Sequence, residues 1–500
     1  MADSSSFTNN IGKNGRRLLC LLLFIPCFFT LVKSLDNDIW FLLNHGRYVL
    51  ANGIPHIEPF TIHEGFKFVM QQWLSAVMFW LAYTALGDIG VKLIVLLCYI
   101  LLVFITYKVC LMISDDNFLV SFFATFLVSV VFVFFMVTRP YVFSSLIFAG
   151  EFFLLESYIK KGKRRYLFFL PILSVLLINL HAAMWPMMFI FIAPYGVESF
   201  RIKIGRFINP GAQKRWLFLA ATLSVVVGFL NPYGLDAMLY LTKSYGYQQI
   251  GATVSEMKPV NINSPFGKIV LLCLLIVPLV YGLYKKGKLN LRYILLALGT
   301  GYMVMSSYRN LFMFALCAYF PLAAYLKDWQ PRIKNETDSK KTLRIRALLI
   351  VLIAALIPLA FYGGYEAEKP RTEKYILLNK AIDQILEDTP AEQVTLYTGY
   401  NSGGMAEFRG LRTYMDARAE VFVKKNNGKA DISEEYTNMQ LGLSYYKTVL
   451  NRYEFSHLLV DEKDFLNTYL PHDSDYKLYY ANEQYSVYVN NIQTDEVQGG

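Results

Sequence analysis

Charged residues are scarce in this chain of 500 residues. Only 17% of the residues are Asp, Glu, Lys or Arg, whereas 55% are hydrophobic. Soluble domains carry about 25% charged residues, so the composition excludes an ordinary soluble protein. The apolar residues gather in long runs, which predicts an α-helical polytopic membrane protein.

Cysteine is also rare, and the chain lacks the short motifs that define common enzyme classes. Its six cysteines all fall in apolar segments: Cys20, Cys27, Cys98, Cys110, Cys273 and Cys317. Neither a disulfide framework nor a zinc site is therefore indicated. The sequence contains no HExxH motif, nucleophile elbow, Walker loop or kinase signature, which removes the enzyme classes that these motifs define.

The net charge of +10 does not indicate a nucleic-acid partner. The Lys and Arg residues cluster in short segments between apolar runs, which is typical of cytoplasmic loops. The clusters occupy residues 160–165, 201–215, 285–292 and 327–346.

Eleven apolar segments are predicted to span the membrane, since a crossing takes about 20 residues. They are residues 18–35, 90–112, 118–138, 141–159, 166–182, 185–200, 216–231, 267–284, 292–308, 310–326 and 346–363. A twelfth run, residues 71–87, reaches only about 24 Å as a helix, which is short of a crossing.

The basic clusters decide the role of residues 71–87. If this run does not cross, a cytoplasmic amino terminus places every cluster on the cytoplasmic side; if it crosses, the positive-inside rule fails four times. We therefore predict that it lies in or dips into the outer interface, within a first outer loop at residues 36–89. Residues 1–17 are then cytoplasmic and residues 18–363 form the transmembrane domain. A half-span around Trp185 and Pro186 would reverse the side of everything that follows.

Residues 364–500 are polar, and their mixed pattern predicts a small extracytoplasmic α/β domain. An amphipathic helix at 371–389 opens it. Strands are predicted at 393–398, 411–416 and 456–461, helices at 401–408 and 441–453, and a terminal hairpin at 476–491. The turn GYNSGG at 399–404 is similar to a phosphate-cradling loop, but a GG pair alone is a weak motif.

Asp36 and Asp38 follow the first apolar run as the sequence DND. A carboxylate at a membrane boundary is costly and usually has a function. Two carboxylates at i and i+2 can share a divalent cation, Mg or Mn, or one can act as general base on an incoming hydroxyl. The simpler alternative is that they end the helix in water.

Further polar residues converge on the same outer face. Arg139 in TRPY and Arg309 in SSYRN are suited to a phosphate leaving group, because guanidinium binds phosphate oxygens in a fork. Other candidates for substrate or phosphate binding are His45, His181 and Glu256. Each has a simpler explanation, such as snorkelling arginines at helix ends or a histidine bonded between helices.

The order of motifs along nearly the whole chain resembles that of the GT-C glycosyltransferases, multi-pass enzymes that use polyprenyl-phosphate sugars outside the membrane. More narrowly, it is similar to an uncharacterised group of bacterial membrane proteins related in plan to the protein mannosyltransferase and aminoarabinose transferase families. The matching pieces are DNDIW with Gly46, NGIPHIEPFT, QQWLS, TRPYVFSSL, INLHAAM, LNPYG, YRNLFMFAL, GYNSGGMAEF and YMDARAEVF.

This resemblance implies that Asp36 or Asp38 is the general base or a metal ligand, that the donor is a polyprenyl-phosphate sugar, and that the site is extracytoplasmic. The chain departs from the group at two positions. Leu42 stands where histidine is frequent, and Gln72 stands where glutamate precedes Trp73. His45 is a candidate to replace such a group.

We therefore predict a cell-membrane glycosyltransferase that inverts the sugar and transfers it to a cell-envelope glycan or similar hydroxyl acceptor. One alternative is a transporter or flippase for lipid-linked sugars, which would need polar residues deep in several spans, and the spans are mostly free of charge at mid-depth. A second is a non-catalytic assembly factor for envelope polysaccharide, with the tail as its working part. Deleting residues 366–500 would separate these functions.

Overall fold

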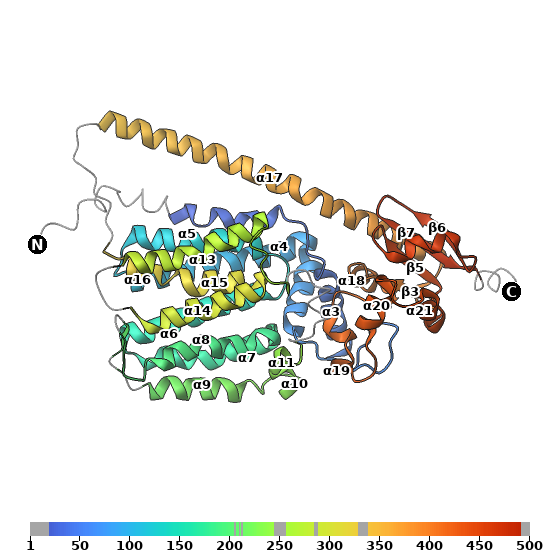
Figure 1. The fold of residues 1–500 in the computed structure, drawn as a ribbon, viewed down its shortest axis with the longest axis horizontal. Helices are drawn as coiled ribbons and strands as arrows, with labels where there is room; N and C mark the ends of the chain where they lie inside the picture. Colours follow the sequence, from blue (N-terminus) through green and yellow to red (C-terminus); the bar gives the residue numbers. More distant parts are fainter. Residues whose placement is uncertain are drawn as a thin grey trace, which may run out of the picture.

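The computed structural model describes residues 20–204, 207–209, 211, 214–244, 257–284, 289–328 and 339–491. For residues 204, 207–209, 244 and 339–360 it describes the backbone alone. The candidate Glu256 lies outside the described residues. Among those described, a bundle of apolar helices carries an α/β domain at one end (Figure 1).

Each of the eleven predicted apolar segments contains helix in the structure. The main elements of the bundle are η1 (Ile25–Leu31), α4 (Trp73–Ile113), α5 (Phe118–Phe135), α6 (Tyr141–Lys161), η2 (Arg164–Phe169), α7 (Leu170–Leu180), α8 (Trp185–Val197), α9 (Arg215–Val227), α13 (Pro265–Leu283), α14 (Leu291–Ser306), α15 (Leu311–Tyr319) and α16 (Leu322–Tyr325). Four of the described helices, α4, α5, α6 and α13, are long and apolar enough to cross a membrane. The chain is a multi-pass membrane protein, as predicted.

Helix α4 contains residues 73–87 of the twelfth apolar run together with the next predicted span, and it is broken at Gly87 (φ 60°, ψ −146°). Only glycine adopts such angles without strain, so the break is encoded locally. Before it, Trp80 and Tyr83 contact Phe408 of the α/β domain, with ring centroids 6.4 and 5.7 Å away. The first part of α4 therefore lies beside that domain; its place in the membrane interface stays a prediction.

The α/β domain contains the strands and the terminal hairpin that its sequence predicts. Its strands are β3 (Thr395–Thr398), β4 (Arg412–Thr413), β5 (His457–Asp461), β6 (Tyr476–Ala481) and β7 (Tyr485–Asn490), in the order β4-β3-β5-β7-β6. Strand β3 is parallel to β4 and β5, whereas β7 is antiparallel to β5 and β6. The helical elements around the sheet are α18 (Gly403–Phe408), η7 (Ala419–Phe422), α19 (Lys424–Asn427), α20 (Ile432–Gln440) and α21 (Tyr446–Tyr453).

Helix α17 (Ser339–Asp388) joins the two parts without interruption. It includes both the last predicted span and the predicted amphipathic helix at 371–389, which the sequence separates by Gly363, Gly364 and Pro370. Figure 1 shows this helix passing along the bundle to the sheet. Phe361 stacks on Phe29 with ring centroids 4.1 Å apart.

The first loop ties the bundle to the α/β domain. Helix α3 (Ile39–Asn52) packs between α4 and α18. The extended chain after it bridges Thr61 to Thr413 in β4, and His63 Nε2 lies 2.8 Å from the carbonyl oxygen of Tyr414. The loop thus extends the edge of the sheet.

Ion pairs collect at the end of the bundle away from the α/β domain. Arg292 contacts Glu156 at 3.1 Å and Glu198 at 2.5 Å, and all three are buried. Asp115 forms ion pairs with both Lys160, at the end of α6, and Lys327, just after α16. Lys160, Arg292 and Lys327, which belong to three of the basic clusters, therefore lie together at the end opposite the α/β domain.

Gly46 permits the close packing of α3 on α4, and its substitution tests that packing. A β-carbon at Gly46 would lie 2.2 Å from the carbonyl oxygen of Ala76 and 2.6 Å from Cβ of Trp80. We expect Gly46→Ala to destabilise the fold by about 1–3 kcal/mol through overpacking, seen as a lower Tm of the purified protein in detergent. Gly299→Ala in α14 is the control, because nothing lies within 4 Å of its β-carbon position; an equal fall in both variants would contradict the packing argument.

Candidate active site

A cavity of about 310 Å³ lies where the bundle, the first loop and the α/β domain meet. The first loop contributes Asp38 and Gln72, and the helix ends of the bundle contribute Arg139, His181 and Arg309. The α/β domain closes the other side. Four residues that the sequence places on one face are therefore brought together here.

Arg139 holds the two carboxylates at the base of this cavity. Its Nε lies 2.6 Å from Oδ1 of Asp36 and 3.2 Å from Oδ2 of Asp38. Asp36 is fixed further: its backbone N–H donates to Oγ1 of Thr138 at 2.9 Å, and its Oδ1 accepts from the Asp38 N–H at 3.1 Å. The side chain of Asp38 is 26% exposed and that of Asp36 is 11% exposed. Asp38 therefore faces the cavity, and Asp36 supports it from behind.

The donor set does not fit a divalent cation shared by the two carboxylates. The Arg139 guanidinium lies between Asp36 and Asp38, where a bridging cation would bind. Among the described residues, no group of three His, Cys, Asp or Glu side chains is arranged to hold a metal ion. Arg139 supplies positive charge between the two carboxylates.

His181 and Arg309 reach the cavity from breaks between helices. His181 ends α7 with extended φ (−162°), and its Nδ1 lies 2.8 Å from Oγ of Ser144. Gln71 holds this break, because it accepts from the N–H of Ala182 at 2.8 Å and from that of Ala183 at 3.1 Å. Arg309 lies in the short turn η5 (Tyr308–Asn310). Because the helices end at these points, the side chains of His181 and Arg309 lie at the end of the bundle and line the cavity.

The α/β domain supplies Tyr400, Asn401 and Glu420 to the cavity lining. Tyr400 and Asn401 belong to the GYNSGG turn, whose ligand-binding role is a prediction. Burial, together with the negative charge of Asp38, raises the pKa of the Tyr400 hydroxyl well above its usual value. Tyr400 therefore remains a hydrogen-bond donor at the cavity wall.

Arg418 also lines the cavity and is the centre of a buried cluster of polar side chains. Arg418 Nη1 donates to Oε1 of Glu58 at 2.9 Å, Nη2 donates to Glu407 at 3.2 Å, and Nε donates to Asp416 at 2.7 Å. Nη1 also lies 3.3 Å from Nε2 of His45. One guanidinium thus connects the first loop to the α/β domain.

The protonation of this cluster follows from its burial. Burial raises the pKa of Glu407 well above its usual value, whereas the charge and hydrogen bonds of Arg418 overcome burial and lower the pKa of Asp416. Burial and the charge of Arg418 keep the pKa of His45 well below its usual value. Both shifts favour the neutral form of the group, a protonated Glu407 and an uncharged His45.

His45 therefore occupies a different place from the one predicted. It does not line the described cavity but packs behind it, stacked on Phe60 with ring centroids 4.8 Å apart. The sequence reasoning also did not single out Glu58, Glu407 or Arg418. The matching piece YMDARAEVF contained the signal, because it carries Asp416, Arg418 and Glu420 within five residues.

Comparison with known proteins identifies the fold. No family model matches the sequence, and no curated protein matches it either. By structure, the chain has the fold of the GT-C multi-pass membrane glycosyltransferases, so the predicted resemblance is confirmed at the level of fold.

Two solved structures illustrate the similarity. ArnT from Cupriavidus metallidurans, bound to undecaprenyl phosphate, matches with a TM-score of 0.58 and 12% identity, over 96% of this chain and 98% of ArnT. The archaeal oligosaccharyltransferase AglB from Archaeoglobus fulgidus, in complex with an inhibitory peptide and a dolichol-phosphate, matches with a TM-score of 0.59 and 11% identity, over 95% of this chain and 74% of AglB.

Loss of the Arg418 guanidinium tests its role in joining the two parts. Arg418→Leu leaves Glu58 and Asp416 buried without their counter-charge, which costs about 3–5 kcal/mol in comparable pairs. We expect the variant to expose the α/β domain to limited proteolysis and to unfold at a markedly lower Tm. The control is Arg409→Leu, whose partner Asp383 is 46% exposed and whose loss costs about 1 kcal/mol or less. Equal protease resistance in Arg418→Leu and the parent chain would contradict the argument.

The raised pKa of Glu407 predicts how stability depends on pH. A carboxyl group that is protonated when folded releases its proton on unfolding, so its contribution to stability falls as pH rises above the ordinary value of about 4.5. Glu407→Gln keeps a neutral amide at this position and removes that dependence. We expect the Tm of the parent to fall relative to that of the variant between pH 5 and pH 8. Parallel Tm profiles over this range would show that Glu407 is ionised in the folded protein.

Proposed function

We propose that this protein transfers a sugar from a polyprenyl-phosphate carrier to a hydroxyl group of an extracytoplasmic acceptor, with inversion at the anomeric carbon. The observation that carries the proposal is the cavity in which a carboxylate, Asp38, faces two guanidinium groups, Arg139 and Arg309. The reaction needs a general base for the acceptor hydroxyl and, close to it, positively charged groups that bind the donor phosphate. The fold supports the same activity, since ArnT and AglB were solved with lipid phosphates bound.

In the proposed reaction, Asp38 takes the proton of the acceptor hydroxyl as its oxygen bonds to the anomeric carbon. The bond from that carbon to the phosphate oxygen breaks, and the phosphate keeps the electron pair. Arg139 and Arg309 stabilise the charge that develops on the phosphate. Because the donor phosphate competes with the carboxylates for Arg139, donor binding also frees Asp38 to act as base.

Asp36 has a positioning role in this scheme. It is less exposed than Asp38 and accepts hydrogen bonds from Arg139 and from the Asp38 backbone. These contacts set the distance between the base and the phosphate-binding arginine. Asp38 is thus assigned as the base and Asp36 as the positioning residue, whereas the sequence alone does not distinguish the two.

The distribution of charge supports an extracytoplasmic cavity. The cavity lies at the α/β end of the bundle, whereas Lys160, Lys327 and Arg292 lie at the other end. The positive-inside rule assigns that basic end to the cytoplasm. The α/β domain, residues 364–500, is then outside and forms one wall of the site. A transporter needs polar groups along a path through the bundle, so the placement of the polar groups at one end favours an enzyme.

Substitution of the two carboxylates tests the proposal. Asp38→Asn removes the base and is expected to lower sugar transfer by about 100-fold or more. Asp36→Asn is expected to lower transfer less, by disturbing Arg139. The measurement is mass spectrometry of surface glycans from a deletion strain that expresses each variant, after its membrane insertion has been verified. Asp88→Asn, an exposed substitution in α4, is the control. Normal glycans in Asp38→Asn cells would refute the assignment of the base.

Arg309 is tested by its effect on donor affinity. Arg309→Gln removes a charge-assisted contact to phosphate, worth about 1.5 kcal/mol or more. We expect the KM for the donor to rise about tenfold, and a smaller rise in Arg309→Lys. The control is Arg412→Gln, whose guanidinium donates to the carbonyl oxygen of Thr61 outside the described cavity. An unchanged KM in Arg309→Gln would remove this residue from the phosphate site.

A further inference from the structure

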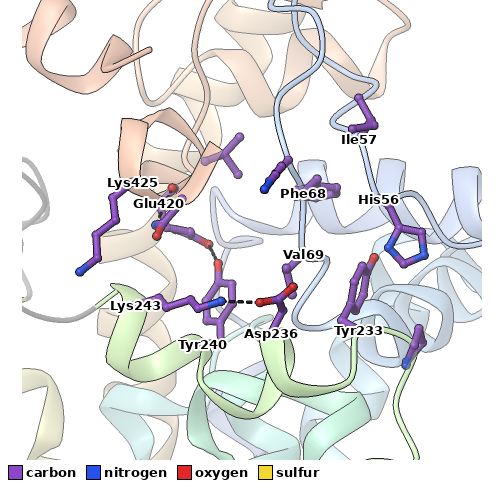
Figure 2. A pocket seen from close by; sticks show the side chains of 14 residues that line it. His56, Ile57, Phe68, Val69, Tyr233, Asp236, Tyr240, Lys243, Glu420 and Lys425 are labelled. Atoms are coloured by element: carbon purple, nitrogen blue, oxygen red, sulfur yellow. Dashed lines mark hydrogen bonds and ion pairs between the residues drawn. The ribbon is translucent and has the colours of Figure 1, made fainter. Parts of the chain in front are cut away.

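A second cavity, of about 580 Å³, lies beside the first. It opens between the first loop, the α/β domain and the helices α10 (Leu235–Met238) and α11 (Tyr240–Ser244) that follow the NPYG turn. Figure 2 shows side chains from all three segments directed toward this space. Its volume is in the range of ligand-binding sites, which measure about 300–1,000 Å³.

Glu420 connects the two cavities, because it lines both of them. Its Oε1 accepts a hydrogen bond from the hydroxyl of Tyr240 at 2.7 Å, so its position is fixed from the side of the second cavity (Figure 2). A ligand in the second cavity that extends past Glu420 therefore approaches the cavity of Asp38. The donor and the acceptor can then approach the base from different sides.

The lining of the second cavity combines positive charge with aromatic surface. It carries three lysines, Lys67, Lys243 and Lys425, against two carboxylates. One carboxylate, Asp236, is ion-paired with Lys243, and the other, Glu420, accepts from Tyr240. Lys67 and Lys425 are exposed and come from different parts of the chain, the first loop and α19.

The aromatic side chains are held in place on another wall. The ring of His56 meets that of Tyr233 edge-on, with centroids 5.1 Å apart, and the Tyr233 hydroxyl donates to the carbonyl oxygen of Pro55 at 2.8 Å. Phe68 is buried behind them. Figure 2 shows His56 and Tyr233 across the cavity from Lys425. Rigid aromatic faces suit the apolar face of a sugar ring, and lysines suit an acidic group on it.

We propose that this second cavity binds the acceptor, and that the acceptor is an anionic saccharide bearing carboxylate or phosphate groups. The proposal rests on the proposed function, because it names the substrate that supplies the hydroxyl to Asp38. Lys67 and Lys425 hold the acidic groups, and Tyr233 contacts a ring. Glu420 lies at the boundary between the acceptor cavity and the donor cavity.

The experiment measures binding to the purified full-length chain in nanodiscs with two matched pairs of probes. The first pair is tetragalacturonic acid and its methyl ester; the second is mannopentaose 6-phosphate and mannopentaose. We expect at least one acidic probe to bind at least tenfold more tightly than its neutral partner. Its affinity is expected to fall with rising salt concentration, since exposed ionic contacts are screened.

Lysine variants locate the binding site. The double variant Lys67→Gln/Lys425→Gln is expected to remove the preference for the acidic probe while leaving affinity for the neutral partner unchanged. Lys463→Gln, an exposed lysine of the α/β domain outside both described cavities, is the control. The proposal is overturned if neither acidic probe is preferred over its neutral partner, or if the double variant binds as the parent does.

A failure of this proposal is distinguishable from a failure of the proposed function. Binding is measured without a donor, and Asp38→Asn is expected to bind the acidic probe as the parent does while losing transfer. Binding that depends on the lysines, with normal glycans in Asp38→Asn cells, would reject the assigned base and keep the saccharide site. Loss of transfer in Asp38→Asn with equal binding of acidic and neutral probes would keep the enzyme and reject the anionic acceptor.

Discussion

The architecture of the site depends on the burial of one guanidinium among carboxylates. Arg418 is 2% exposed and contacts Glu58 of the first loop together with Glu407 and Asp416 of the α/β domain. A buried arginine must be paired in this way, because the desolvation of an isolated charge is very costly. The pairing fixes the first loop against the sheet, and Asp38 lies at the start of the helix that begins that loop. The geometry of the proposed base thus depends on a domain that is remote from it in sequence.

Helix breaks give the other wall of the cavity its polar groups. The bundle is apolar along its length, and a continuous helix would leave its end without side chains of the right chemistry. His181 follows the end of α7, Arg139 lies two residues before the start of α6, and Arg309 lies in the turn between α14 and α15. Each break also exposes backbone groups, some of which Gln71 satisfies. The same first loop that carries Asp38 therefore stabilises the opposite wall.

The sequence predicted the convergence of Asp38, Arg139, His181 and Arg309, because hydropathy and loop charge determine which helix ends face the same side. It did not predict the Arg418 cluster. In polar segments such as the first loop and the α/β domain, the carboxylates Glu58 and Glu407 have the same sequence pattern as solvated surface residues, and only long-range contacts reveal that they are buried. His45 lies on the helix that follows the acidic pair, on a face turned toward Arg418, which the spacing alone does not reveal. The strands of the α/β domain were predictable, since short alternating patterns encode them locally.

The uninterrupted helix α17 has a mechanical consequence. At about 1.5 Å per residue, a helix of this length forms a rod about 75 Å long without a flexible joint. Phe361 and Glu368 of this helix contact Phe29 and Ser34, so α17 is fixed against the first apolar segment. Helix α17 packs on β6 and β7 of the sheet, and a change in bilayer thickness alters the tilt of a membrane helix. The orientation of the sheet is therefore coupled to that of α17.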